Sequence, residues 1–74
     1  MNEIIVAIKA EYENASRKYP PFHSTHEGYA VIQEEVDELW DLVKRNKGIT
    51  GNDDMRKECI QIAAMAIRFI WDLR

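Results

Sequence analysis

The sequence predicts an all-α protein, a small bundle of three helices that forms one domain over residues 1–74. Apolar residues recur at intervals of three and four positions along most of the chain, which is the spacing of a helix face. Helix breakers divide the chain into three such segments, with Pro20-Pro21 at the first boundary and Gly48 and Gly51 at the second. A chain of 74 residues is long enough for one domain only.

The first helix is expected from about Glu3 to Lys18. Pro20-Pro21 then ends it, because proline lacks an amide hydrogen and disfavours a helical residue before it. The apolar residues that recur at helical spacing in this segment are Ile4, Ile5, Ile8, Tyr12 and Ala15.

A capping box marks the start of the second helix. Ser24 is a good N-cap residue and Glu27 follows three positions later, so each side chain can bond to a backbone amide at the helix start. The helix is expected to run from Thr25 to Arg45 or Asn46. The two glycines in the segment 47–52 predict a loop after it.

The second helix carries two stripes when its residues are turned by about 100° each. In one stripe Glu35 and Glu38 lie between Val31 and Leu42. Carboxylates do not usually lie between aliphatic side chains on a face that is simply exposed to solvent. We therefore do not interpret this stripe as a plain solvent-exposed face. The main apolar face consists of Ile32, Val36, Leu39, Trp40 and Val43, and plain solvent exposure is expected for Asp37, Asp41, Lys44 and Arg45.

The third helix is expected from an N-cap at Asn52 or Asp53 to about Leu73. It is apolar almost all round over residues 60–71, and a helix of this kind is buried on several sides. Two partner helices can hardly cover it, and a core of this size is marginal alone. We therefore expect oligomerisation through the third helix, in a homodimer or a homotetramer, to complete the core. The polar residues on its one remaining side are Glu58, Gln61, Arg68 and Asp72.

Composition excludes several classes of partner. The net charge is −3 with acids and bases interspersed, whereas nucleic-acid-binding proteins normally carry a basic face. No membrane partner is expected, because the chain starts without the basic region of a signal peptide and its longest apolar stretch is too short for a span. The one cysteine, Cys59, is expected to be a small buried hydrophobic residue. These features predict a cytoplasmic protein.

Carboxylates are concentrated on the second helix. Glu34 and Glu38 are four apart and Glu35 and Glu38 are three apart, so both pairs are surface neighbours that repel by roughly 0.2–0.5 kcal/mol. Glu58 and Gln61 repeat the spacing of three on the third helix. If the two stripes face each other, four oxygen-bearing side chains meet. A hard cation between them, Mg²⁺ or alternatively Mn²⁺, would reverse the repulsion.

This arrangement resembles the MazG-like all-α nucleoside triphosphate pyrophosphohydrolases, whose pattern is Glu-Glu-x-x-Glu and, after a gap, Glu-x-x-Asp. Residues 34–38 match the first half, and Glu58-Cys59-Ile60-Gln61 matches the second half with one departure. The segment 26–30 and the apolar run after Glu58 also look like the compact single-domain members. The resemblance extends roughly from Phe22 to Phe69.

The resemblance implies an enzyme that cleaves a nucleoside triphosphate between its α- and β-phosphates with the help of Mg²⁺, giving a monophosphate and pyrophosphate. Glu35, Glu38 and Glu58 would be metal ligands, and Glu34 would be either a fourth ligand or the residue that orients water. Gln61 stands where the family has aspartate, and its amide offers a metal an oxygen but no charge. The alternative function is therefore a catalytically degenerate relative, a helical oligomer that binds a nucleotide or a protein.

Arg68 and Phe22 are the candidates for substrate binding. Arg68 lies in an apolar segment, where it either clamps a phosphate or forms an ion pair with Asp72 or with an acid of the second helix. Phe22, next to Pro21, could line a pocket. The plainest alternative for the acidic residues is a solvated face in a structural helical module, because glutamate favours helices.

The histidines and tryptophans are assigned structural roles. His23 and His26 flank the cap of the second helix, where capping and surface roles are expected rather than metal ligation. Trp40 and Trp71 are expected to pack in the core or in an interface rather than to stack on a base.

Overall fold

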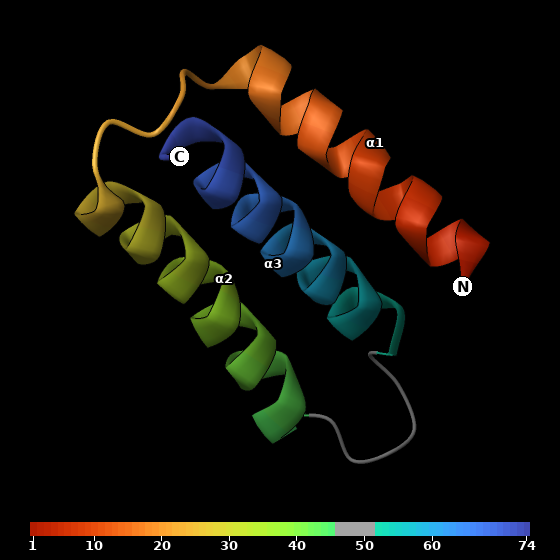
Figure 1. The fold of residues 1–74 in the computed structure, drawn as a ribbon. Coiled ribbons are helices and arrows are strands. Elements are labelled where there is room, and N and C mark those ends of the chain that lie inside the picture. The colour runs from red at the N-terminus through yellow and green to blue at the C-terminus, as the bar shows by residue number, and fades with distance from the viewer. Residues whose placement is uncertain (46–51) are drawn as a thin grey trace.

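The computed structural model describes residues 1–45 and 52–74, which form three helices and no strand (Figure 1). They are α1 (Asn2–Lys18), α2 (Thr25–Arg45) and α3 (Asn52–Asp72). The predicted all-α fold is confirmed, and the helix ends lie within one residue of those predicted. The predicted loop and Asn46 fall outside the described residues, except for Asn52, which begins α3.

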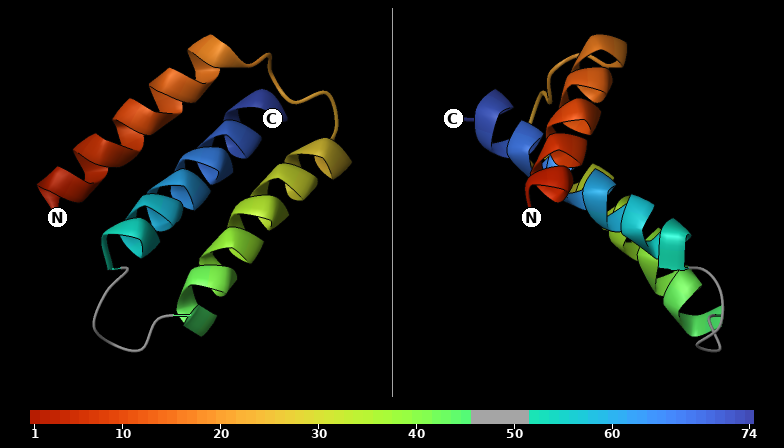
Figure 2. Two further views of the ribbon diagram at one scale, coloured as in Figure 1. Left: turned by 180° about the vertical axis from the view of Figure 1, so that it is seen from behind. Right: turned by 90° about the vertical axis from the view of Figure 1, so that its right-hand side faces the viewer.

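α3 lies between α1 and α2, and both of them pack against it (Figure 1, Figure 2). Within the described ranges, the backbones of α1 and α2 do not approach each other closely. The three helices therefore lie side by side, over extents of 39 × 28 × 19 Å. α3 is covered on two sides rather than enclosed.

The buried core of the chain is small. It consists of Ala15 from α1, Phe22 from the α1–α2 linker, and Ala64 and Met65 from α3. Partly buried side chains from all three helices and from the end of the chain pack around this group, namely Tyr12, Val31, Ile32, Phe69 and Leu73.

Several apolar side chains that were expected to be covered lie in solvent. Cys59 is exposed, contrary to the prediction that it is buried. Trp40, on the expected main apolar face of α2, is 57 % exposed. The reason is that α1 and α2 each pack only against α3, so the remaining faces have no helix of this chain to cover them. Exposure is shared by Val36, Val43, Ile67, Ile70 and Trp71. In the described part of the chain, no helix has the combination of length and apolar character that would cross a membrane.

The linker between α1 and α2 is attached to the C-terminal half of α3. Nη2 of Arg68 donates a hydrogen bond to the carbonyl oxygen of Pro20 at 2.8 Å, and the guanidinium lies 4.5 Å from the centre of the Phe22 ring. The amide of Phe22 donates to Oδ2 of Asp72 at 3.1 Å. Asp72 in turn lies 3.8 Å from Arg68. These contacts fix residues 20–22 on α3, and with them the adjoining ends of α1 and α2.

The predicted capping box forms at the start of α2. The amide of Glu27 donates to Oγ of Ser24 at 3.1 Å. In return, Oε1 of Glu27 accepts a hydrogen bond from the amide of His23 at 2.6 Å. Two amides at the helix start are thereby satisfied, which determines where the linker becomes helical.

Gly28 allows α2 to approach α3 closely, and this gives a prediction. A Cβ at this position would lie 2.6 Å from Cδ2 of Phe69 and 3.2 Å from Cδ2 of Phe22. Overpacking of this kind costs about 1–3 kcal/mol, against about 1 kcal/mol gained from the better helix propensity of alanine. Gly28→Ala should therefore lower the free energy of unfolding, measured by urea titration. An unchanged or higher value would contradict this close contact.

Candidate metal centre and adjoining pocket

Three carboxylates from two helices converge where α2 packs against α3. Glu35 and Glu38 come from α2 and Glu58 comes from α3, and one oxygen of each lies within 4.8 Å of the others. The spacing of three residues puts Glu35 and Glu38 on one side of α2. The structure thus brings together the three carboxylates among the four side chains that the sequence placed in facing stripes.

These carboxylates are incompletely satisfied within the chain. Glu35 and Glu58 are half-buried, and the Oε2 atom of each is buried without a hydrogen-bond partner. A buried polar atom in this state costs about 1–3 kcal/mol. Carboxylates that share one site also repel each other when ionised. In the chain alone, the cluster therefore opposes folding.

The electrostatic cost appears in the pKa values of the cluster. Burial, hydrogen bonding to Glu58 and the charge of Glu38 together raise the pKa of Glu35 to about 8. Hydrogen bonding to Glu58 and the charge of Glu58 raise the pKa of Glu38 as well. At neutral pH the cluster consequently retains a proton that an ordinary glutamate has lost.

A hard divalent cation fits this set of donors. Carboxylate oxygens are the ligands that Mg²⁺ and Mn²⁺ prefer. An ion between them would give the buried oxygens of Glu35 and Glu58 a partner, and it would replace the repulsion among the three carboxylates by attraction. Mg²⁺ in proteins usually has some protein ligands and fills its other coordination positions with water or phosphate oxygens. Three carboxylates are compatible with this coordination.

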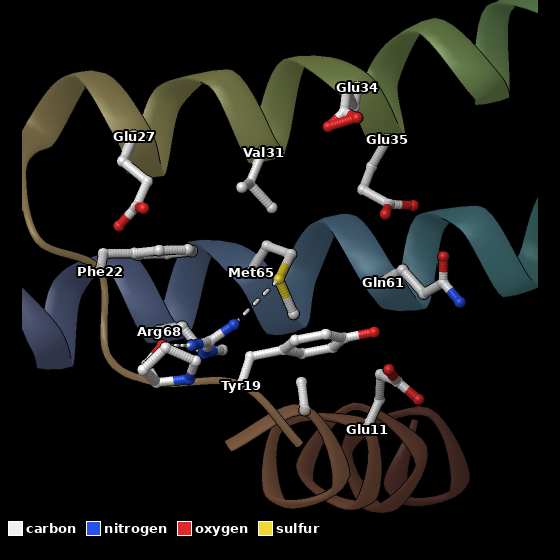
Figure 3. Close-up of a pocket in the computed structure, with 12 residues that line it drawn as sticks. Glu11, Tyr19, Phe22, Glu27, Val31, Glu34, Glu35, Gln61, Met65 and Arg68 are labelled. Atoms are coloured by element: carbon white, nitrogen blue, oxygen red, sulfur yellow. Dashed lines mark hydrogen bonds between the residues drawn. The ribbon is translucent and has the colours of Figure 1, made fainter. Parts of the chain in front are cut away.

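A pocket of about 460 Å³ adjoins the carboxylates. It lies in the groove between α1 and α2, with α3 as its floor and the linker at one end (Figure 3). Its volume is within the range of about 300–1,000 Å³ that is usual for small-molecule sites. Glu35 belongs both to the pocket wall and to the carboxylate cluster, so a ligand in the pocket would reach a metal bound at the cluster.

Arg68 and Phe22, the two candidates for substrate binding, both line this pocket. Arg68 is only 3 % exposed, and its guanidinium is engaged by Pro20, Phe22 and Asp72. Nη1 of Arg68 also contacts Sδ of Met65 at 3.8 Å (Figure 3). Of the interpretations drawn from the sequence, the ion pair with Asp72 is present, and Arg68 shapes the linker end of the pocket.

Glu34 and Gln61 line the pocket too, Glu34 as an exposed residue and Gln61 as a half-buried one. Gln61 lies one turn beyond Glu58 on the same side of α3, so the residue next to Glu58 on this side is a neutral amide. His23 and His26 are exposed, and among the described residues neither belongs to a group of three close candidate metal ligands.

Tyr19 and Glu11 line the pocket, and the reasoning from sequence assigned no role to either of them. Tyr19 is 60 % exposed and its ring lies across the pocket (Figure 3). Its place at the end of α1, directly before two prolines, was the available signal. Glu11 is half-buried and contributes a carboxylate from α1. It lies three residues after Ile8 and four before Ala15, which puts it beside the apolar face of the helix.

Comparisons with protein-family models, with curated proteins and with solved structures found no match for this chain. The functional argument therefore depends on the residues of the site and on their geometry.

The raised pKa of Glu35 predicts how the stability of the metal-free protein depends on pH. The folded chain binds this proton with a pKa of about 8, against an ordinary 4.5. The stabilisation that the proton provides is complete below pH 4.5 and is lost as the pH rises through 8. In EDTA, the melting temperature should fall between about pH 5 and about pH 8 and level off above that range, and Glu35→Gln should show a smaller fall.

Glu34→Gln is the matched control for this measurement, because it removes a neighbouring carboxylate that lies outside the three-residue cluster. It should retain the pH dependence of the wild type in thermal melts followed by circular dichroism. If Glu35→Gln also retained that dependence, Glu35 would not be the titrating group.

Proposed function

We propose that this protein is a MazG-like, Mg²⁺-dependent nucleoside triphosphate pyrophosphohydrolase that releases a monophosphate and pyrophosphate in the cytoplasm. The observation that carries the proposal is the convergence of Glu35, Glu38 and Glu58, with buried unpartnered oxygens, beside a pocket of suitable size. The order and spacing of these residues in the sequence support the same reaction.

Each acidic residue has a role in this proposal. Glu35, Glu38 and Glu58 would hold the cation, Mg²⁺ or alternatively Mn²⁺, and the amide oxygen of Gln61 would be a further, neutral ligand. When bound, the metal supplies positive charge that offsets the charge developing on the phosphate oxygens. Glu34, next to Glu35 at the exposed edge of the pocket, orients the water that attacks the α-phosphorus as pyrophosphate leaves.

The charge of the site supports a requirement for a cation. A triphosphate that approached the protein alone would be repelled by the carboxylate of Glu34 and by the negative charge that the three-carboxylate cluster keeps after it has bound one proton. Arg68 offers it little compensation, because the guanidinium is buried and paired with Asp72. Nucleotide and metal are therefore expected to bind together, each increasing the affinity for the other.

A second candidate function is that of a non-catalytic relative that binds a nucleotide or a protein partner. Gln61 favours it, because this residue stands at the position where the family pattern has its last acid. A neutral amide attracts a cation less strongly than a carboxylate does, and the missing charge could prevent turnover while leaving binding intact.

Glu38→Ala tests the proposed reaction most directly. The wild type should release pyrophosphate from a panel of nucleoside triphosphates in the presence of Mg²⁺. The variant should lose at least about 100-fold in kcat/KM, because a metal ion contributes several kcal/mol to transition-state stabilisation. Asp37→Asn is the control, since this neighbouring carboxylate is exposed and lies outside the cluster. Activity that survived Glu38→Ala would exclude the mechanism.

The same assay with Gln61→Asp separates the two candidate functions. A wild type without activity, together with release of pyrophosphate by Gln61→Asp, would identify a degenerate relative whose lost charge can be restored. An active wild type would reject the non-catalytic candidate.

We further propose that the chain forms a homodimer or a homotetramer through α3. The chain exposes 5668 Å², whereas a compact monomer of its mass, 8.7 kDa, is expected to expose about 4,700 Å². The difference of roughly 950 Å² is close to the about 800 Å² that each partner buries in a standard interface. A second copy of the chain is therefore the proposed cover for the exposed apolar faces.

An apolar groove between α1 and α3 offers a surface for this assembly. It is lined by Ile5 and Ile8 from α1 and by Ala63, Ala66 and Ile67 from α3. Successive residues of a helix are rotated by about 100° around its axis. Most of the α3 residues in the groove therefore point to roughly the opposite side of the helix from the α3 residues that line the pocket. A second copy seated on this groove would leave the pocket accessible.

Ile67→Lys tests the assembly, because it places a charge in the groove. The wild type should sediment as a dimer or tetramer in analytical ultracentrifugation, and the variant should shift towards the monomer. Val6→Lys is the matched control, since Val6 is an exposed apolar residue of α1 outside the groove. A monomeric wild type would contradict the proposed assembly.

A further inference from the structure

We propose that the pocket selects nucleotides whose base is cytosine or adenine, which carry an exocyclic amino group at C4 or at C6, and that Glu11 accepts a hydrogen bond from this group. The inference rests on the proposed function and deepens it by naming the class of base. It arises from the composition of the pocket wall, which combines the carboxylates of Glu11, Glu27 and Glu34 with the exposed ring of Tyr19.

The base would lie on the α1 side of the pocket, across the groove from the metal ligands. The phosphates would lie at Glu35 on α2, because this residue is shared by the pocket and the carboxylate cluster. Glu11 lies on the opposite side of the groove, level with Gln61, and the ring of Tyr19 lies beside it (Figure 3). The nucleoside would therefore span the groove from α2 to α1.

Tyr19 offers the base an aromatic surface. Its side chain is 60 % exposed, and its ring lies between Met65 and α1 (Figure 3). Phe22 is less suited to this role, because it is buried and its ring is covered by the Arg68 guanidinium. Stacking on an aromatic ring tolerates every base, so Tyr19 supplies affinity without selection.

Selection among the bases then comes from hydrogen bonds to the edge of the base. Glu11 is the carboxylate of the pocket that is available to accept such a bond. Glu27 already accepts a hydrogen bond from the amide of His23. Glu34 is adjacent to Glu35, at the phosphate end of the pocket. Glu11 is half-buried and reaches the pocket from α1, the helix that contributes none of the metal ligands.

The chemistry of a carboxylate determines which bases it favours. An ionised carboxylate only accepts hydrogen bonds, so it pairs with the amino group at C4 of cytosine or C6 of adenine. The carbonyl oxygen at the same place in uracil or hypoxanthine is also an acceptor and would be repelled. Arg68 does not remove this bias, because it already donates to Pro20 and pairs with Asp72.

The test compares nucleotides that differ at this one position. Mg²⁺-dependent release of pyrophosphate is measured for CTP against UTP and for ATP against ITP, and binding of CMP against UMP is measured by isothermal titration calorimetry. The amino member of each pair should be preferred by at least about tenfold. Glu11→Gln introduces an amide that can donate as well as accept, and it should reduce the preference to about twofold or less.

Glu13→Gln is the matched control, because it makes the same change at an exposed position of α1 outside the pocket. It should retain the preference of the wild type. Turnover without a preference, or a preference that Glu11→Gln leaves unchanged, would overturn the assignment of the base and leave the proposed reaction intact.

The binding measurement separates the two proposals if the protein binds nucleotides but does not hydrolyse them. A tenfold preference for CMP that Glu11→Gln abolishes, in a protein that hydrolyses none of the triphosphates, would support the base pocket and reject the reaction. A protein that neither bound nor hydrolysed any of these nucleotides would overturn both.

Discussion

The buried guanidinium of Arg68 maintains the arrangement of the three helices. It donates to the carbonyl of Pro20, lies over the ring of Phe22 and pairs with Asp72. Because α1 and α2 pack only against α3, the attachment of their linker to α3 sets the distance between them. A buried charge that loses its partner typically costs about 3–5 kcal/mol. The groove that contains the pocket therefore depends on this one cation having its partners.

In the described part of the chain, the buried guanidinium of Arg68 and the half-buried carboxyl groups of Glu35 and Glu58 have very different surroundings. Arg68 is supplied with an acceptor, an aromatic face and a counter-charge by its own chain. Glu35 and Glu58, in contrast, keep buried oxygens without a partner and lie against a third carboxylate. The second arrangement lowers the stability of the fold, which is a cost that functional sites commonly carry. This contrast supports a structural role for the arginine and a ligand-binding role for the glutamates.

Local patterns in the sequence were sufficient to predict the helices, because helix ends depend on residues close in the chain. The cap at Ser24 located the start of α2. The site was predictable in part: spacing indicated that Glu35 and Glu58 lie on stripes that could meet, and the structure brings them together. The exposure of Cys59 and the position of the Tyr19 ring in the pocket could not be derived from helix periodicity, although the two prolines after Tyr19 mark it as the residue at the helix end. Both features depend on which sides of α3 the other helices cover, and periodicity within one helix contains no information about that choice.

The separation of α1 from α2 has a consequence for how such a protein can diversify. The clustered carboxylates come from α2 and α3 alone, whereas Glu11 and Tyr19 come from α1 and its end. Substitutions on α1 can therefore remodel one wall of the pocket without disturbing the carboxylate geometry. The proposed ligand preference and the proposed metal binding could therefore change independently over generations, even though the described helices share one small core.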